Sequence, residues 1–154
     1  MGEQVDLVLF EVGQRRLALR APVVQEIVRA AAISPLPQAP AIVEGVINVR
    51  GIVLPVVDIR SRFELPALAL SPDHHLIVAR TSRRTLVLRV DQVVGLIQVS
   101  GDAVLPPETV TPGSRHIAGI ARLADGVVVI QDLDQFLSLD EAAELEAALP
   151  ASGP

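Results

Sequence analysis

The sequence contains no cysteine, and this absence removes several kinds of chemistry. Without cysteine the chain has no disulfide, no thiolate metal ligand and no thiol nucleophile. Residues 1–13 also lack the basic segment, apolar core and small-residue cleavage site of a signal peptide. We therefore expect a protein of the reducing cytoplasm.

Aromatic residues and lysine are also scarce. Phe, Trp and Tyr together make up 2% of the chain, and lysine is absent, so that arginine supplies all 13 cationic side chains. The formal net charge is −5. Because nucleic-acid binding usually combines a basic face with stacking aromatics, this composition argues against a nucleic-acid partner. No phosphate-binding P-loop is present either, and we predict no cofactor and no metal.

Long hydrophobic runs are missing although hydrophobic residues make up 50% of the chain and the mean hydropathy is +0.46. Charged or turn residues interrupt each apolar run well before the roughly 18 residues that a membrane-spanning helix needs. We expect no membrane insertion, and the apolar residues are assigned to a core. A chain of 154 residues is long enough for one domain or two small lobes.

Short apolar segments separated by turn residues predict a mainly β protein. The expected hairpins pair residues 7–12 with 17–19, 46–49 with 52–57, 76–79 with 86–90, and 117–121 with 127–130. A further apolar segment covers residues 93–99. Ser138 and Glu141 form a capping-box pattern that predicts a C-terminal helix over residues 139–149.

The two halves of the chain resemble one another. Residues 15–28 resemble residues 83–97, and residues 45–65 resemble residues 119–139. The matched features are Gly45 with Gly119, the turn Arg50-Gly51 with Asp125-Gly126, and Asp58 with Asp132.

Duplicated short strands predict two small barrels, because apolar edge strands cannot stay open in water. We expect one domain over residues 1–154, with lobe 1 at about 13–65 and lobe 2 at about 75–135. The N-terminal strand and the helix at 139–149 are expected to pack across both lobes.

Few residues suggest catalysis. Asp58 and Asp132 could form an acid–base pair of a hydrolase, or each could cap the helical turn that follows its strand. His74 and His75 are adjacent, so an extended segment would point them to opposite faces, and a solvated loop end is expected.

Arg50 stands at the tip of an otherwise apolar hairpin, between Asn48 and Gly51. It could be an ordinary exposed turn residue, with Gly51 present to allow a positive φ. Its planar guanidinium could equally donate two hydrogen bonds to a carboxylate of another protein.

The stretch GVINVRGIVLPVVDIRSRF, residues 45–63, resembles the most distinctive segment of CheW-like domains. VVQEI at residues 23–27 resembles the preceding segment of that family, and residues 119–138 resemble its second half. The resemblance extends from about Leu7 to about Leu149. It implies a fold of two five-stranded SH3-like β-barrels with a terminal α-helix.

The resemblance also implies a function, that of a non-enzymatic adaptor of chemotaxis signalling. Such adaptors bind the regulatory domain of a CheA-type histidine kinase and the cytoplasmic tips of chemoreceptors, which recruits them to membrane-bound receptor arrays. Six residues match family positions associated with these contacts: Val24, Glu26, Gly45, Asn48, Arg50 and Gly51. For the kinase surface, Arg83 and Arg84 are candidates, with a solvated turn as the alternative.

Several assignments stay open. The pathway could be flagellar chemotaxis, pilus-based motility or another chemosensory output, and the fold could also serve as a regulatory module of a kinase. Other CheW-like domains are candidate partners, because a homo-oligomeric protein that pairs its strand edges or lobes is a third alternative.

Overall fold

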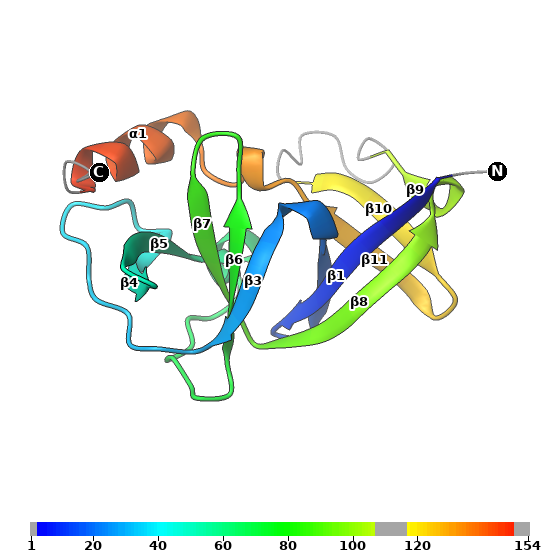
Figure 1. The fold of residues 1–154 in the computed structure, drawn as a ribbon, viewed down its shortest axis with the longest axis horizontal. Helices are drawn as coiled ribbons and strands as arrows, with labels where there is room; N and C mark the ends of the chain where they lie inside the picture. The colour runs from blue at the N-terminus through cyan, green and yellow to red at the C-terminus, as the bar shows by residue number, and fades with distance from the viewer. Residues whose placement is uncertain (1–2, 107–116, 150–154) are drawn as a thin grey trace.

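The protein is described by a computed structural model that covers residues 3–106 and 117–149. Figure 1 shows a β-rich molecule with one α-helix packed at one end of the described chain. The strands are β1 (Gln4–Val12), β2 (Arg15–Arg20), β3 (Val24–Arg29), β4 (Val43–Val49), β5 (Ile52–Asp58), β6 (His75–Arg80), β7 (Thr85–Val90), β8 (Gln92–Ser100), β9 (Val104–Leu105), β10 (Ile117–Leu123) and β11 (Gly126–Gln131). The helical segments are the short η1 (Ala21–Val23), η2 (Ile59–Phe63), η3 (Gly101–Ala103) and η5 (Leu133–Gln135), and the α-helix α1 (Leu139–Ala148).

The strands form two sheets. Sheet A has the order β8-β1-β2-β11-β10-β9, and sheet B has the order β3-β6-β7-β5-β4. The predicted fold class, a mainly β protein with two SH3-like subdomains and a C-terminal helix, is confirmed. Sheet A has a sixth strand because the two-residue β9 pairs with β10.

The sheets do not follow the predicted lobe boundaries at 13–65 and 75–135. β1 and β2 belong to sheet A while β3, β4 and β5 belong to sheet B, and β6 and β7 belong to sheet B while the strands from β8 onward belong to sheet A. Each sheet therefore combines two strands of one half with strands of the other half. The prediction assumed that consecutive strands stay in one sheet, which is the commoner arrangement.

The predicted duplication is nevertheless visible in the pairing. β2 runs parallel to β11, with Ala18 beside Ile130, and β7 runs parallel to β5 in the same way, with Leu88 beside Val57. Both hairpins carry a register shift, at Gly45 in β4 and before Gly119 in β10.

The predicted match between the two hairpin turns was wrong by one residue. Val49 pairs with Ile52, and Leu123 pairs with Gly126. The turn equivalent to Arg50-Gly51 is therefore Ala124-Asp125. Gly126 already belongs to the following strand, β11.

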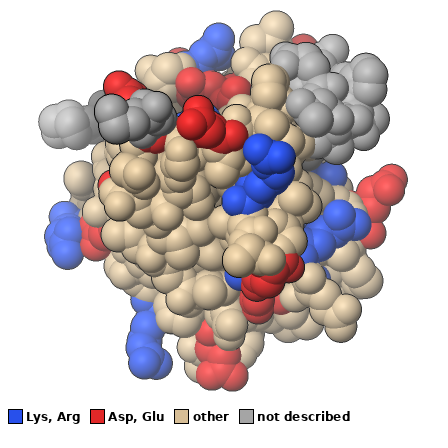
Figure 2. Space-filling model, turned by 90° about the vertical axis from the view of Figure 1, so that its right-hand side faces the viewer, with Lys and Arg blue, Asp and Glu red and all other residues tan. Residues whose placement is uncertain are grey.

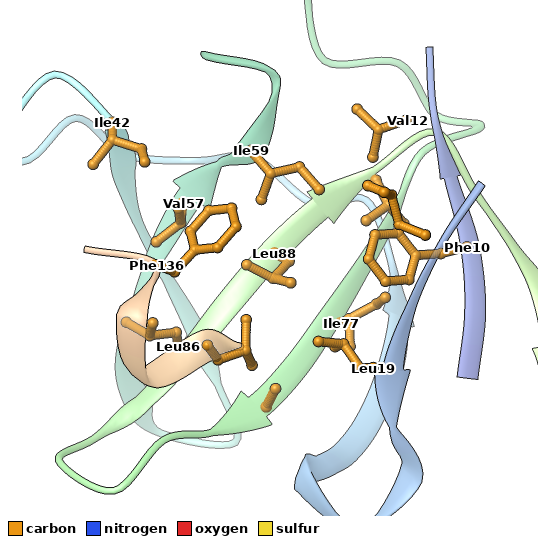
Figure 3. Close-up of a cluster of buried hydrophobic side chains, with 14 of the residues drawn as sticks. Phe10, Val12, Leu19, Ile42, Val57, Ile59, Ile77, Leu86, Leu88 and Phe136 are labelled. Carbon is orange, nitrogen blue, oxygen red and sulfur yellow. The ribbon is translucent and has the colours of Figure 1, made fainter. Parts of the chain in front are cut away.

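The main core lies between the sheets and joins them. The hairpins β1–β2 and β6–β7 bury both faces, because alternate side chains enter either the shared core or the core of one sheet. In Figure 3, side chains from both hairpins meet those of β5, η2 and the segment before α1. The buried residues of this shared core include Phe10, Val12, Leu19, Val57, Ile59, Ile77, Leu86, Leu88, Phe136 and Leu145.

The C-terminal helix docks on the shared core. Ser138 accepts a hydrogen bond from the Glu141 N–H, and the Glu141 side chain accepts one from the Ser138 N–H, so the predicted capping box is present. Leu145 is fully buried. Arg62 of η2 donates from Nε to the Phe136 carbonyl at 2.9 Å and pairs with Glu141. These contacts hold the segment between β11 and α1 against η2, which follows β5.

Candidate protein-binding surface

The turn between β4 and β5 is held by a side-chain hydrogen bond, and its arginine is exposed to solvent. Arg50 and Gly51 have φ values of 53° and 85°, the pair of positive angles found in type I′ hairpin turns. The Asn48 side-chain oxygen accepts a hydrogen bond from the Gly51 N–H at 2.8 Å. Three of the six predicted residues thus build one turn, and Arg50 presents its side chain with 78% exposure.

Glu26 of β3 forms an ion pair with Arg50, which follows β4, so the contact joins the two edge strands of sheet B. Arg50 Nη1 donates to Glu26 Oε2 at 2.7 Å, although β3 and β4 lie at opposite ends of the strand order. Nearby, a bridge joins Val46 of β4 to Ser34, which lies in the connection between β3 and β4. Sheet B is thus curled, and its two edges approach each other at this ion pair.

The sequence had suggested a carboxylate of another protein as the partner of Arg50, and the structure shows one within the chain. The contact uses Nη1 alone, so Nε and Nη2 face no hydrogen-bond acceptor among residues 3–106 and 117–149. The guanidinium can therefore donate hydrogen bonds to a second carboxylate, one that belongs to another protein.

Val24 and Gly45 have mainly structural contacts. Val24 packs, half-buried, against the shared core and stands just before a bulge in β3. A Cβ at Gly45 would lie 2.1 Å from the Ser34 carbonyl oxygen, so only glycine allows the close approach of the two segments.

Apolar side chains beside these residues are exposed, and the sequence analysis did not select them. Ile27 follows Glu26 and is 39% exposed, while Ile52 and Val53 follow the turn with 62% and 47% exposure. For Ile52 and Val53 the available signal was their position directly after a polar turn, whereas Ile27 lies inside β3 and carried no such signal. Exposed apolar side chains close in sequence to Glu26 and Arg50 are the kind of group that a protein partner can cover.

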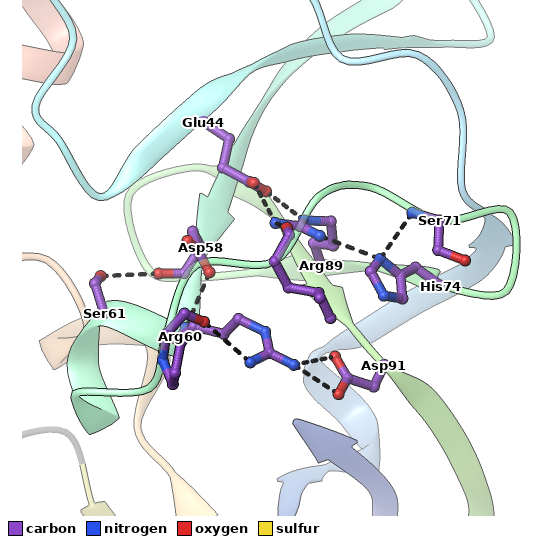
Figure 4. Close-up of polar contacts among 10 residues, drawn as sticks. Glu44, Asp58, Arg60, Ser61, Ser71, His74, Arg89 and Asp91 are labelled. Atoms are coloured by element: carbon purple, nitrogen blue, oxygen red, sulfur yellow. Dashed lines mark hydrogen bonds and ion pairs between the residues drawn. The ribbon is translucent and has the colours of Figure 1, made fainter. Parts of the chain in front are cut away.

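A buried charge network lies at the start of β4, at the other end of that strand from Arg50, and was not predicted (Figure 4). Arg89 of β7 donates from Nε and Nη2 to the Glu44 carboxylate at 2.8 and 2.6 Å, and from Nη2 to the Leu68 carbonyl at 2.8 Å. Its side chain is only 5% exposed. The signal in the sequence was one arginine inside the apolar run of residues 86–90.

His74 belongs to this network, so the expected solvated position was wrong. Nδ1 of His74 accepts a hydrogen bond from the Ser71 N–H at 3.2 Å and lies 3.1 Å from Arg89 Nη1. Burial first, and then the charge of Arg89, lower the pKa of His74 below its ordinary value of 6.5. The neutral ring acts as an acceptor that holds the loop before β6 in place.

A second ion pair connects the two sheets. Asp91, between β7 and β8, binds Arg60 Nη2 with its two oxygens at 3.1 and 2.8 Å. The same carboxylate accepts a hydrogen bond from the N–H of Gly13, in the β1–β2 turn, at 2.8 Å. These contacts fix the orientation of one sheet relative to the other.

Asp58 and Asp132 both serve as helix caps, the structural alternative raised above. Asp58 accepts a hydrogen bond from the Arg60 N–H and Asp132 from the Asp134 N–H, each at 3.0 Å. No cluster of three or more metal-ligating side chains occurs within the described ranges.

Comparison with known proteins agrees with this arrangement of sheets and motifs. The model of the family described as "CheW-like domain" matches residues 6–141. The chain belongs to the CheW-like domain family. Members of this family act as scaffolds or adaptors in chemotaxis signalling.

The relatives of this CheW-like chain match it along most of their length. Chemotaxis protein CheW of Treponema pallidum is 30% identical over 149 residues, covering 93% of this chain and 88% of that protein. Chemotaxis protein CheW of Rhizobium meliloti is 33% identical over 138 residues, covering 88% and 89%. The crystal structure of the scaffolding protein TtCheW from Thermoanaerobacter tengcongensis has a TM-score of 0.81 at 27% identity, covering 92% of this chain and 96% of that one.

Two further observations bear on the surface. None of the helices in the described ranges is long and apolar enough to cross a membrane. Figure 2 shows the end of the molecule formed by sheet A, where arginine and acidic side chains are interspersed around a broad uncharged area. That mixture of charges differs from the continuous basic surface typical of nucleic-acid binding.

Proposed function

We propose that this CheW-like chain is a cytoplasmic, non-enzymatic adaptor that couples chemoreceptors to a CheA-type histidine kinase at membrane-bound receptor arrays. The receptor tip binds at the end of sheet B, where Glu26 and Arg50 meet beside Ile27, Ile52 and Val53. The regulatory domain of the kinase binds elsewhere on the chain.

The observation that carries this proposal is a difference between the two related halves. Gly95 follows the bulge in β8 as Glu26 follows the bulge in β3, and Ala124 takes the turn position of Arg50. The equivalent end of sheet A thus forms without this ion pair, so the fold does not require it. A charge pair that only one end possesses is best explained by what that end binds.

The free guanidinium nitrogens and the neighbouring apolar side chains suggest how a receptor helix is held. An amphipathic helix would place apolar side chains on Ile27, Ile52 and Val53, and an acidic side chain near Arg50. Glu26 would keep Arg50 in its orientation before the partner arrives, which lowers the entropic cost of binding.

The experiment is a titration of the full chain against a receptor-tip fragment and a CheA-type regulatory domain from the same genome. Arg50→Ala should weaken receptor binding about tenfold or more, as expected for loss of a charged anchor, and leave kinase binding unchanged. Thermal stability should not fall, because the ion pair is exposed. Arg122→Ala, on the exposed face of β10, is the matched control.

The results separate the alternatives. An equal loss of receptor binding and stability in Arg50→Ala would show that Arg50 is structural. No binding of either fragment to the unmodified chain would reject the coupling role and favour self-assembly, which sedimentation at increasing concentration would reveal.

A second candidate concerns the pathway rather than the mechanism. Protein FrzA of Myxococcus xanthus is 31% identical over 114 residues, covering 73% of this chain and 71% of that protein. This similarity supports a chemosensory output other than flagellar chemotaxis, which the choice of receptor fragments in the titration would test.

A further inference from the structure

Two adjoining pockets lie away from the Glu26–Arg50 surface, where sheet B meets the segment that leads into α1. The larger has a volume of about 680 Å³ and lies between the β6–β7 turn and α1, and the smaller, of about 250 Å³, lies between β2, β6, β10 and β11. They share Leu133 and Asp134 and form one depression, named here the junction groove. Figure 1 shows the β6–β7 turn standing beside α1.

The groove combines an apolar floor with unpaired arginines. Leu86 and Leu133 are buried in its floor, and Leu139 stands on its rim with 77% exposure. Four arginines line it, and among the described residues none of their side chains makes an ion pair: Arg20, Arg80, Arg83 and Arg84. Such a concentration of unpaired cations is unexpected in a chain of net charge −5.

The acidic side chains of the groove are already engaged. Asp134 accepts a hydrogen bond from the Ser82 N–H at 2.7 Å, and Asp132 caps η5. Thr81 Oγ1 accepts from the N–H groups of Arg83 and Arg84 at 3.1 and 3.0 Å. The turn is therefore held in a fixed shape while its guanidinium groups remain available.

One more group indicates the chemistry of the occupant. Gln131 is 4% exposed and lines the smaller pocket, and its Oε1 is buried without a hydrogen-bond partner. The arginines can donate hydrogen bonds to carboxylates, the amide oxygen can accept one from an N–H group, and the leucines can pack against apolar side chains. A peptide supplies all three kinds of group, whereas a simple anion supplies only the first.

We propose that the junction groove is a docking site for an acidic amphipathic protein segment, separate from the receptor surface. The segment places apolar side chains over Leu86 and Leu133 and carboxylates against Arg83 and Arg84. The charge complementarity commits the site to an acidic partner. None of the six residues matched to family contact positions lines the groove, whereas Arg83 and Arg84, the kinase-surface candidates of the sequence, both do.

The test is a fluorescence-anisotropy titration of the full chain with a labelled synthetic amphipathic helix that carries leucines on one face and glutamates beside them. Saturable 1:1 binding that weakens with salt is expected. Arg83→Glu/Arg84→Glu should weaken it at least about tenfold, since two attractive charge pairs become repulsive. The milder Arg83→Gln/Arg84→Gln should lie in between, and Arg122→Glu is the matched control.

Amide chemical-shift mapping then locates the peptide, with shifts expected at Ser82, Asp134 and Ala142. The proposal fails if the peptide does not saturate, if a lysine-bearing version binds equally well, if Arg122→Glu has the same effect, or if the shifts fall on β3 and β8. It also fails if Arg83→Glu/Arg84→Glu instead abolishes self-association or kinase binding, because the groove would then serve a second copy or the kinase. Thermal melts of each variant confirm that it is folded.

Discussion

Arg89 and Glu44 form a bidentate ion pair across sheet B, in which Arg89 Nε and Nη2 each donate to one carboxylate oxygen. The residues stand on β7 and β4, which are separated by β5 in the sheet. Arg89 also bonds the Leu68 carbonyl and contacts His74. A single buried guanidinium thus connects two strands and the loop between η2 and β6.

Removing the charge of Glu44 should destabilise the protein strongly. Glu44→Gln leaves the Arg89 charge buried without its counter-ion, which costs about 3 kcal/mol of unfolding free energy. Urea denaturation monitored by circular dichroism would measure the loss. In the exposed pair Arg16–Asp125, Asp125→Asn should cost less than about 0.5 kcal/mol, and equal effects of both variants would contradict the assigned burial.

Stability should fall in mildly acidic solution because of His74. Its pKa is lowered in the folded state, so the unfolded chain binds its proton more readily. The contribution of neutral His74 is complete above the ordinary pKa of 6.5 and is lost as the pH falls through the lowered folded value. Among the smaller effects, the negative charges of Asp91 and Glu44 raise the pKa of His74, and the positive charge of Arg60 lowers it.

The measurement is the urea midpoint at pH 7.5 and 5.5 for the unmodified chain and for His74→Gln. Glutamine keeps an acceptor for Arg89 but cannot be protonated, so the variant should lose less stability between the two pH values. The same loss in both proteins would mean that other groups cause the pH dependence.

Gly45→Ala should be more harmful than Gly51→Ala although both glycines belong to the same sequence motif. A Cβ at Gly45 meets the Ser34 carbonyl oxygen, and the forced separation should cost about 3 kcal/mol. At Gly51 nothing lies within 4 Å, and only its φ of +85° opposes a side chain, at about 1 kcal/mol. Thermal melts would rank the two, and the reverse order would disprove the close contact.

Leu145→Ala should test the docking of the terminal helix. The side chain is fully buried in the shared core, and its truncation should cost about 3 kcal/mol through the lost contacts and the cavity left behind. Leu139→Ala, in the same helix but 77% exposed, should change the unfolding free energy by less than about 0.5 kcal/mol. If Leu145→Ala were as mild as this control, the helix would not be part of the core.

Local patterns predicted the strands of the four hairpins, the capping box and, as one of two alternatives, the caps at Asp58 and Asp132, because alternation and capping depend on neighbouring residues. The strands β3 and β9 were not predicted. The resemblance selected Glu26 and Arg50 separately, and only the curling of sheet B shows that they touch. The buried network around Arg89 was missed because its partners lie far apart in the sequence. The predicted lobe boundaries differ from the observed sheets for the same reason. The sequence of β3 contains no local pattern that indicates its pairing with β6.

The exchange of strands between the halves suggests how such a chain can arise. A half-length chain with five strands would form both sheets as a homodimer if each copy placed its last three strands in the other copy's sheet, which is domain swapping. Joining the two copies end to end would give the present strand order. In such a fused chain the two ends are free to diverge, and they do differ, with Glu26 and Arg50 on one end and Gly95 and Ala124 on the other. Covalent fusion thus allows a symmetric ancestor to become a protein with one distinct binding end.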